Sequence, residues 1–228
     1  MSFTAYLSDL TADAAVLHGR VGDVAAMIDL FCASFEQVPR RIVLDIDDTL
    51  DRVHGHQQLS LFHGHYDSRC FLPMHIYEAV TGKPVAVILR PGKTPDGTEV
   101  ALVLRHVVQA IRVRWPAVDI VIRGDSHYAR PEAMDWLERH RVGYVFGLAG
   151  NRILMDRIAD LAEDVAVRRA EKGDGKVRRF RDLRYAARTW RIERRVIARV
   201  EATAQGGDSR FIVTNLAGTP RWLYEHLY

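Results

Sequence analysis

The sequence has few cysteines, no long apolar run and no basic leader, and each of these absences excludes a class of protein. Its two cysteines among 228 residues, Cys32 and Cys70, form no disulfide or metal-binding pattern and fit a reducing cytoplasm. No apolar run approaches the roughly 18–20 residues that a membrane-spanning helix needs. Acidic residues stand near the N-terminus, where a signal peptide carries Lys or Arg. The sequence therefore predicts a cytoplasmic protein without a membrane partner.

Charge is distributed unevenly along the chain. The whole chain has a net charge of +3, and its 48% hydrophobic and 27% charged residues are typical of a folded globular protein. Between Arg168 and Arg199, however, 13 Lys and Arg residues stand against 4 Asp and Glu residues, a net of +9, which leaves −6 for the remaining residues. An acidic part beside a strongly basic one suits a metal site next to a surface that binds a polyanion.

Hydrophobic periodicity predicts strands and helices in alternation. A helix over 21–35 is followed by three strands, and the turn at Thr81-Gly82-Lys83-Pro84 makes the second and third an antiparallel hairpin. Pro116 ends a long amphipathic helix that begins near Asp96 or Thr98. The later elements are strands over 117–125 and 142–150, helices over 130–140 and 151–172, and a β-rich segment over 179–216.

This order favours an α/β protein with a mixed sheet flanked by helices, the layout of an RNase H-like fold, and with a β-rich insertion. A chain of 228 residues suits one large domain, or one domain with an inserted subdomain. We expect four parts: an N-terminal helical segment over 1–40, the first part of a catalytic core over 41–168, a basic β-rich insertion over 169–208, and the last core strand with the start of a helix over 209–228.

The segment LDIDDT puts three carboxylates at the end of an otherwise apolar strand. Asp45 and Asp47 lie two residues apart, so they point to the same face of that strand. Burial of carboxylates without a positive partner is costly, and magnesium usually takes one or two carboxylates together with waters and substrate phosphates. The motif predicts a metal site at the strand end. A strand-end turn that uses Asp is the simpler alternative.

A second carboxylate, Asp125, ends the apolar run of IVIRGD in the same way. Carboxylates at the ends of separate strands can converge on one metal cluster even when they are far apart in sequence. Two metal ions held in this way activate an attacking oxygen and stabilise the leaving one in phosphodiester chemistry. Taken alone, Asp125 is also compatible with a turn or a helix cap before Pro131.

Two further polar segments give weaker indications. Arg90 and Lys93 lie in the loop RPGKT between a strand and a helix, where their charges can approach a phosphate, although the loop lacks the first glycine of a P-loop. Five of the ten histidines fall between His54 and His75. Without paired cysteines or helical spacing, they favour a solvated loop that faces DNA over a zinc site.

The basic β-rich segment interleaves arginines with aromatic residues. Strand alternation would place the guanidinium groups on one or two faces of a sheet, which suits binding to the phosphate backbone of nucleic acid. A charged edge that opposes aggregation is the alternative. The candidate DNA-binding residues of this segment are Arg178, Arg179, Arg181, Arg184, Arg188, Arg191 and Arg195, and Arg90 and Lys93 join them from the earlier loop.

Taken alone, IVLDIDDTL resembles the first motif of haloacid-dehalogenase-type phosphatases. That resemblance implies Asp45 as the nucleophile and Asp47 as the acid/base. The phosphatase fold needs a parallel sheet and a helix soon after the motif, whereas here a loop with glycines and histidines and then a hairpin follow. The later acidic motif also has Tyr128-Ala129-Arg130 where its second Asp is expected.

Four longer phrases in order resemble the group-1 DDE transposases of bacterial insertion sequences: LDIDDT, VHGHQQLSLFHGHYDSRCFLPMHIYEAVTGKPVAVILRPGKTP, IRGDSHYARPEAM and YVFGLAGN. The resemblance runs from about Val43 to Tyr228. It implies an RNase H-like catalytic domain with Asp47 and Asp125 as catalytic, metal-binding carboxylates, and Asp45 is a less favoured metal ligand. It also implies two Mg²⁺ or Mn²⁺ ions, double-stranded DNA (transposon ends and target) as substrate, and a nucleoid-associated location in a bacterial cytoplasm, and it allows a homodimer.

The third carboxylate of that family, a Glu, lies on a helix that follows the last core strand. In this chain the last core strand is SRFIVTNL, and Glu225 stands in the first turn of the next helix, earlier than the family position. We therefore do not assign the role to Glu225 and expect the third carboxylate beyond Tyr228. The expectation is a truncated transposase with little strand-transfer activity of its own. Thr49 and His127 are expected as neighbours of the two assigned carboxylates.

Overall fold

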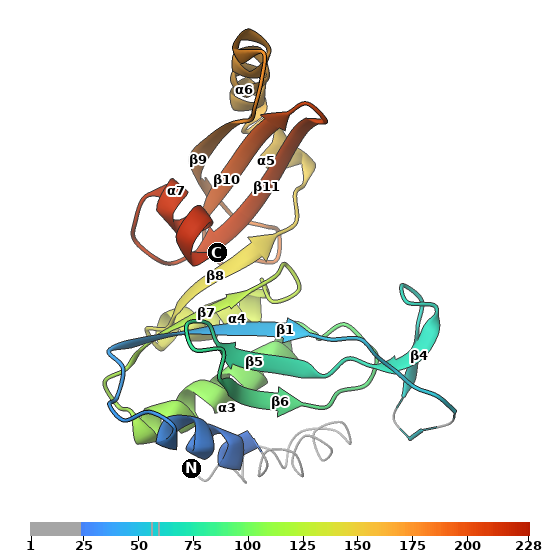
Figure 1. Ribbon diagram of the computed structural model, residues 1–228, viewed down its shortest axis with the longest axis vertical. Helices are drawn as coiled ribbons and strands as arrows, with labels where there is room; N and C mark the ends of the chain where they lie inside the picture. The colour runs from blue at the N-terminus through green and yellow to red at the C-terminus, as the bar shows by residue number, and fades with distance from the viewer. Residues whose placement is uncertain (1–23, 56, 59) are drawn as a thin grey trace. The chain divides into compact units, whose positions relative to one another are not determined.

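The computed structural model describes residues 24–55, 57–58 and 60–228 (Figure 1). The chain forms two compact units, Met1–Ile120 and Val121–Tyr228, which are described separately below. Within the described residues, no helix is both long enough and apolar enough to cross a lipid bilayer.

The sheet of the first unit contains three antiparallel strands in the order β6-β5-β1. These strands are β1 (Arg41–Asp48), β5 (Met74–Glu78) and β6 (Pro84–Ile88). The turn between β5 and β6 is closed by the Glu78 carboxylate, which accepts hydrogen bonds from the N–H groups of Val80 and Thr81. The hairpin that the turn residues predict is therefore confirmed.

Two helices of the first unit lie beside each other. Helix α3 (Gly97–Arg114) begins after Asp96, whose side chain accepts a hydrogen bond from the N–H of Glu99. A second helix spans residues 24–33, within the predicted range 21–35. The Phe31 and Trp115 rings, with centroids 5.5 Å apart, join the second helix to the end of α3. The prediction of α3 from Asp96, Pro116 and its apolar spacing is therefore confirmed.

The stretch between β1 and β5 forms a small separate sheet. Its three short strands are antiparallel in the order β2-β4-β3, with bounds β2 (Asp51–Arg52), β4 (Ser68–Phe71) and β3 (Leu61–His63). This is the irregular or short-strand structure that the lack of a helical period predicts. Figure 1 shows it as an extension beyond the ends of β1 and β5.

The second unit contains a mixed sheet in the order β7-β8-β11-β10-β9. Strands β7 (Asp119–Gly124) and β8 (Gly143–Leu148) are parallel and are connected through helix α4 (Pro131–Arg139). All other neighbours are antiparallel, with bounds β9 (Val177–Tyr185), β10 (Arg194–Thr203) and β11 (Gly206–Thr214). The α/β class and the mixed sheet are confirmed.

The segment predicted as one helix over 151–172 forms two helices, α5 (Arg152–Asp156) and α6 (Ala159–Lys172). The chain bends at Arg157, whose backbone C=O accepts a hydrogen bond from Arg181 and whose side chain donates one to the C=O of Arg184. These bonds fasten the bend to β9. The prediction of a continuous helix was wrong because apolar spacing does not report such a tertiary constraint.

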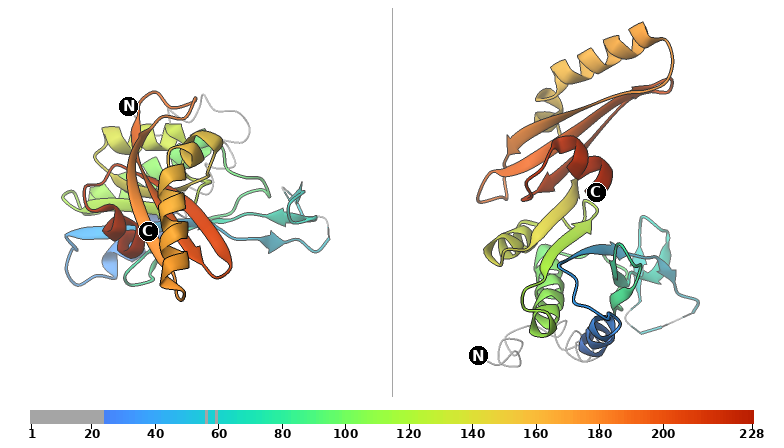
Figure 2. Two further views of the ribbon diagram at one scale, coloured as in Figure 1. Left: turned by 90° about the horizontal axis from the view of Figure 1, so that it is seen from above. Right: turned by 60° about the vertical axis from the view of Figure 1, so that its left-hand side comes forward.

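Helices cover both faces of the β9–β11 sheet. Helix α6 lies across one face, and the short helix α7 (Pro220–Trp222), continued by the π-helical turn η1 (Leu223–Leu227), lies on the other (Figure 2). Leu223 is fully buried there, in a cluster with Val145, Ile197 and Ile212. This cluster attaches α7–η1 to the centre of the sheet.

Candidate active site and nucleic-acid interface

The carboxylates of LDIDDT lie on the more exposed face of β1. Ile42, Leu44 and Ile46 are at most 2% exposed, whereas Asp45 between them is half-buried and Asp47 is exposed. The period-two prediction that both aspartates share one face is therefore confirmed. The apolar face anchors the strand, so the position of both carboxylates is set by a rigid element.

The Asp47 carboxylate is oriented by its own backbone. Its Oδ1 accepts a hydrogen bond of 2.9 Å from the N–H of Asp48. In the antiparallel register with β5, Asp47 stands opposite His75 and Asp45 opposite Tyr77, so the four side chains share one face of the sheet. The rings of His75 and Tyr77 are stacked, with centroids 6.1 Å apart.

His75 is a neighbour of Asp47 that the sequence pattern does not single out. Its Nδ1 is buried and, among the described residues, has no hydrogen-bond partner. The sequence places this histidine in a group of five, and only the β1–β5 register shows which of them faces an acidic residue of the motif. His63 and His65 instead lie in the small sheet and its turn, where their rings contact Tyr66.

Asp125 directly follows β7 and forms a tight turn. Its Oδ1 accepts a hydrogen bond of 2.8 Å from the N–H of His127, and its Oδ2 lies 3.5 Å from the His127 Nδ1. Both side chains are about half exposed, at 49% for Asp125 and 51% for His127. Helix α4 has Arg130 as its N-cap residue, so Asp125 is a turn residue and not a helix cap. The turn leaves the carboxylate at an exposed strand end.

The last residue of the chain lies beside this turn. A Cβ atom placed on Gly147 of β8 would lie only 2.7 Å from the Tyr228 hydroxyl oxygen and 3.0 Å from the N of Ser126, so only glycine fits there without movement. Burial, then Tyr224 and Asp125, raise the pKa of Tyr228. The phenol is therefore neutral at physiological pH. This neighbour of Asp125 was missed because the two are about a hundred residues apart in sequence.

A divalent ion would find carboxylate oxygens in each unit. Asp45 and Asp47 belong to the first unit and Asp125 to the second, so each site is described within its own unit. Among the described residues, no three His, Cys, Asp or Glu side chains form a group able to hold a metal. Carboxylates at rigid strand ends are nevertheless the donors that magnesium prefers, and that ion usually keeps several waters. The donor chemistry thus fits, and the convergence of Asp47 with Asp125 stays a prediction.

The loop between β6 and α3 is held by Arg90. This residue is 1% exposed, and its guanidinium donates to both carboxylate oxygens of Glu99, at 2.6 and 2.9 Å, and to the C=O of Leu72. A buried, fully engaged guanidinium is not available to a phosphate, so the structure does not support Arg90 as a DNA contact. Lys93 in the same loop is exposed and stays a candidate.

The arginines of β9 alternate between the two faces of the sheet. Arg178 faces α7–η1 and forms ion pairs with Glu201 and Glu225, whereas Arg181 faces α6 and forms an ion pair with Asp160. Arg195 pairs with Asp182 and also donates to the C=O groups of Leu216 and Gly218. Several of the candidate DNA-binding arginines therefore also stabilise the fold. Those that are exposed are Arg179, Arg184, Arg188 and Arg191.

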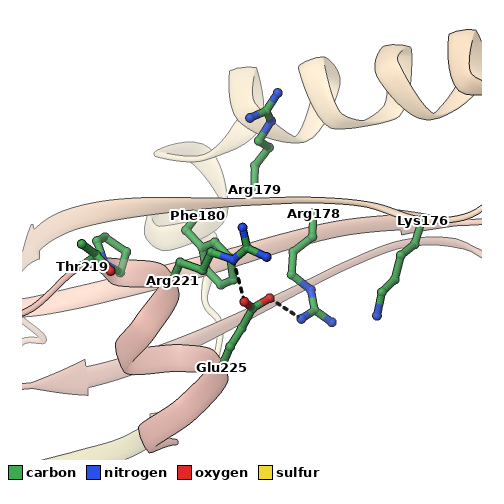
Figure 3. Close-up of a pocket in the computed structure, with 8 residues that line it drawn as sticks. Lys176, Arg178, Arg179, Phe180, Thr219, Arg221 and Glu225 are labelled. Atoms are coloured by element: carbon green, nitrogen blue, oxygen red, sulfur yellow. Dashed lines mark hydrogen bonds and ion pairs between the residues drawn. The ribbon is translucent and has the colours of Figure 1, made fainter.

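A hollow of about 510 Å³ lies between β9 and α7–η1 (Figure 3). Lys176, just before β9, and Arg178 and Phe180 of β9 alternate along the chain and point into it, whereas Arg179 points to the opposite side. Arg221 and Glu225 border the hollow from the helix. Hydrogen bonds from Arg221 and, next, from Arg178 lower the pKa of Glu225, so its carboxylate is ionised at neutral pH.

Comparison with known proteins agrees with the geometry. The family model described as "Transposase DDE domain group 1" matches the chain over residues 11–228. The match begins before Val43, so it reaches further toward the N-terminus than the resemblance of the motifs. No curated protein matches the chain. The mixed sheet with helices, the strand-end aspartates and a family match over almost the whole length lead to one conclusion: the chain belongs to the group-1 DDE transposase domain family.

Proposed function

We propose that this chain is the catalytic domain of an insertion-sequence transposase, with Asp47 and Asp125 as its first two catalytic carboxylates. The observation that carries the proposal is the LDIDDT strand, in which three buried apolar residues fix two aspartates at an exposed strand end. Family membership supports the same chemistry, the cutting and joining of DNA phosphodiesters.

Asp47 and Asp125 would hold the divalent ions, Mg²⁺ or Mn²⁺, and Asp45 is a further candidate ligand. Such ions supply charge stabilisation for the phosphodiester oxygens and lower the pKa of a bound water. The chain contributes the orientation of the carboxylates: the N–H of Asp48 fixes Asp47, and the N–H of His127 fixes Asp125. Exposed basic residues, Lys93 in the first unit and Arg179, Arg188 and Arg191 in the second, would bind the DNA phosphates.

We further propose that this chain alone has little strand-transfer activity. Glu225 is the carboxylate on the helix that follows β11, and it forms ion pairs with Arg178 and Arg221 at 2.8 and 2.7 Å. A carboxylate engaged by two guanidinium groups is poorly suited to bind a metal ion. The proposal therefore assigns Glu225 no catalytic role.

Asp47→Asn is expected to weaken Mn²⁺ binding by about tenfold or more, because it removes a charged ligand whose loss is worth at least about 1.4 kcal/mol. Binding is measured from the decrease of the free Mn²⁺ signal in electron paramagnetic resonance, and Asp125→Asn is tested in parallel. Asp51→Asn, an exposed aspartate on β2, is the matched control and should bind as the unmodified chain does. Equal Mn²⁺ binding by all four proteins would refute the assignment.

A phosphatase of the haloacid-dehalogenase type is the competing function, because β1 carries the DxDxT pattern. Strand β1 pairs antiparallel with β5, however, and a small antiparallel sheet follows the motif, whereas that fold needs a parallel strand and a helix. We therefore expect no hydrolysis of an aryl phosphate above background in Mg²⁺. Hydrolysis that disappears on Asp45→Asn would favour the phosphatase instead.

A further inference from the structure

The hollow between β9 and α7–η1 combines three basic side chains with an internal carboxylate. Lys176 and Arg221 are 59% and 76% exposed, whereas Arg178 is 24% exposed and lies deeper. Glu225, at 19%, is bound between Arg178 and Arg221 through one oxygen to each. Figure 3 shows the carboxylate between the two guanidinium groups at the edge of the hollow.

A phosphate offers the same two-oxygen acceptor geometry as this carboxylate. Guanidinium groups bind both anions through parallel N–H donors, and a phosphodiester in the hollow would also reach the Lys176 ammonium. Arg178 is already neutralised by Glu201 across the β9–β10 pair, so the charge that Glu225 compensates is mainly that of Arg221. If Glu225 moves away, the hollow gains one unit of positive charge.

We propose that Lys176, Arg178 and Arg221 form a binding site for a phosphodiester of the DNA backbone, and that Glu225 occupies this site until DNA displaces it. This inference rests on the proposed function, because it specifies one place where the basic part of the chain holds DNA. It gives Glu225 a role as an internal competitor. The hollow is large enough for a phosphate and part of its sugar.

Glu225→Gln is expected to raise the affinity for a short fluorescein-labelled DNA duplex by about three- to tenfold, because the amide no longer competes for Arg221 and Arg178. Affinity is measured by fluorescence anisotropy over a series of salt concentrations. Glu163→Gln removes a charge from the exposed part of α6, on the opposite face of the sheet. This control is expected to change the affinity by less than about twofold, since salt screens distant exposed charges.

Lys176→Gln and Arg221→Gln test the same site in the opposite direction. Each should lower the affinity and reduce the slope of log K against log salt by about one, the signature of one lost phosphate contact. The control Arg152→Gln removes a 94%-exposed arginine from α5 and should leave the slope unchanged. Lys176 forms a loose 3.8 Å ion pair with Glu201 and makes no contact with Glu225 that would hold the helix, as far as the described residues show, so its substitution tests the site even if Glu225→Gln disturbs the helix.

The outcomes separate this inference from the proposed function. If the chain does not bind the duplex even at low salt, the proposed function itself is contradicted. A second outcome is that the chain binds the duplex but each variant has the same affinity as its control, Glu163→Gln for the acidic position and Arg152→Gln for the two basic ones. In that case DNA is held elsewhere, and only the phosphate site is refuted. A higher DNA affinity for Glu225→Gln, together with a lower affinity for both Lys176→Gln and Arg221→Gln, supports the site.

Discussion

Replacement of Arg194 by methionine is expected to lower the free energy of unfolding of the second unit by about 3 kcal/mol. Arg194 is 2% exposed, and its Nε donates to Glu138 at 2.8 Å while its Nη2 donates to Asp135. Methionine fills a similar volume but leaves both carboxylates without their cation. This value is at the lower end of the destabilisation usual for a broken buried ion pair, because the two carboxylates remain about a quarter exposed.

Aromatic side chains extend the cluster around Arg194. The guanidinium lies 5.3 Å from the centroid of the Trp190 ring, and the Tyr144 hydroxyl donates to the same Glu138 carboxylate at 2.7 Å. Burial, and next the hydrogen bond to Glu138, raise the pKa of Tyr144, so this phenol stays neutral and remains a donor. Without Arg194, the neutral Tyr144 hydroxyl would still donate to Glu138 but would not replace the lost positive charge. Arg194 also links α4 to β10.

The destabilisation is measured by urea unfolding followed by circular dichroism. Arg191→Met is the matched control, because Arg191 is exposed three residues earlier, and it should change the unfolding free energy by less than about 0.5 kcal/mol. Adding Glu138→Gln to Arg194→Met should recover part of the loss, since it removes one of the unpaired charges. If Arg194→Met is as stable as the control, the ion cluster makes no net contribution to the free energy of unfolding.

Local patterns of the sequence predict the elements of the fold well where each element is determined by its own residues. The alternation of Leu44, Asp45 and Ile46 gives both the strand and its buried face. Asp96 and Pro116 similarly delimit α3, because a cap and a proline act within one turn of the chain. The break of the predicted 151–172 helix was not visible, because it depends on hydrogen bonds from β9.

The same distinction between local features and tertiary contacts applies to the candidate site. Asp47 and Asp125 are recognised from strand ends and motifs, which are local features. The sequence alone suggests Arg90 as a phosphate contact, because it does not show that the guanidinium is paired with Glu99. That pairing depends on how the loop packs against α3. Cross-strand pairing likewise determines that Arg178 meets Glu201, which a count of arginines cannot show. Net charge predicts a basic surface, but internal ion pairs decide how much of that charge remains for DNA.

Leu223→Ala is expected to cost about 3 kcal/mol at the docking surface of α7–η1. Leu223 is fully buried against Val145, Ile197 and Ile212, so its truncation leaves a cavity in the middle of that contact. Residues 220–227 form α7–η1, and helical stability in proteins comes mostly from packing of an apolar face, here that of Leu223. We therefore expect the loss to appear mainly as local opening of the helix, with the sheet still folded.

Hydrogen exchange followed by mass spectrometry distinguishes local from global opening. In Leu223→Ala, amides of the C-terminal helix should exchange faster while those of β10 and β11 remain protected, and Ile192→Ala, at an exposed side chain, is the control. Equal loss of protection in the helix and the strands would contradict local docking. The same helix carries Arg221 and Glu225, so its release would remove one cation and one carboxylate from the hollow and leave Arg178 paired with Glu201. Leu223→Ala should therefore bind DNA no more tightly than Ile192→Ala, because Arg221 leaves the hollow together with the internal carboxylate of Glu225.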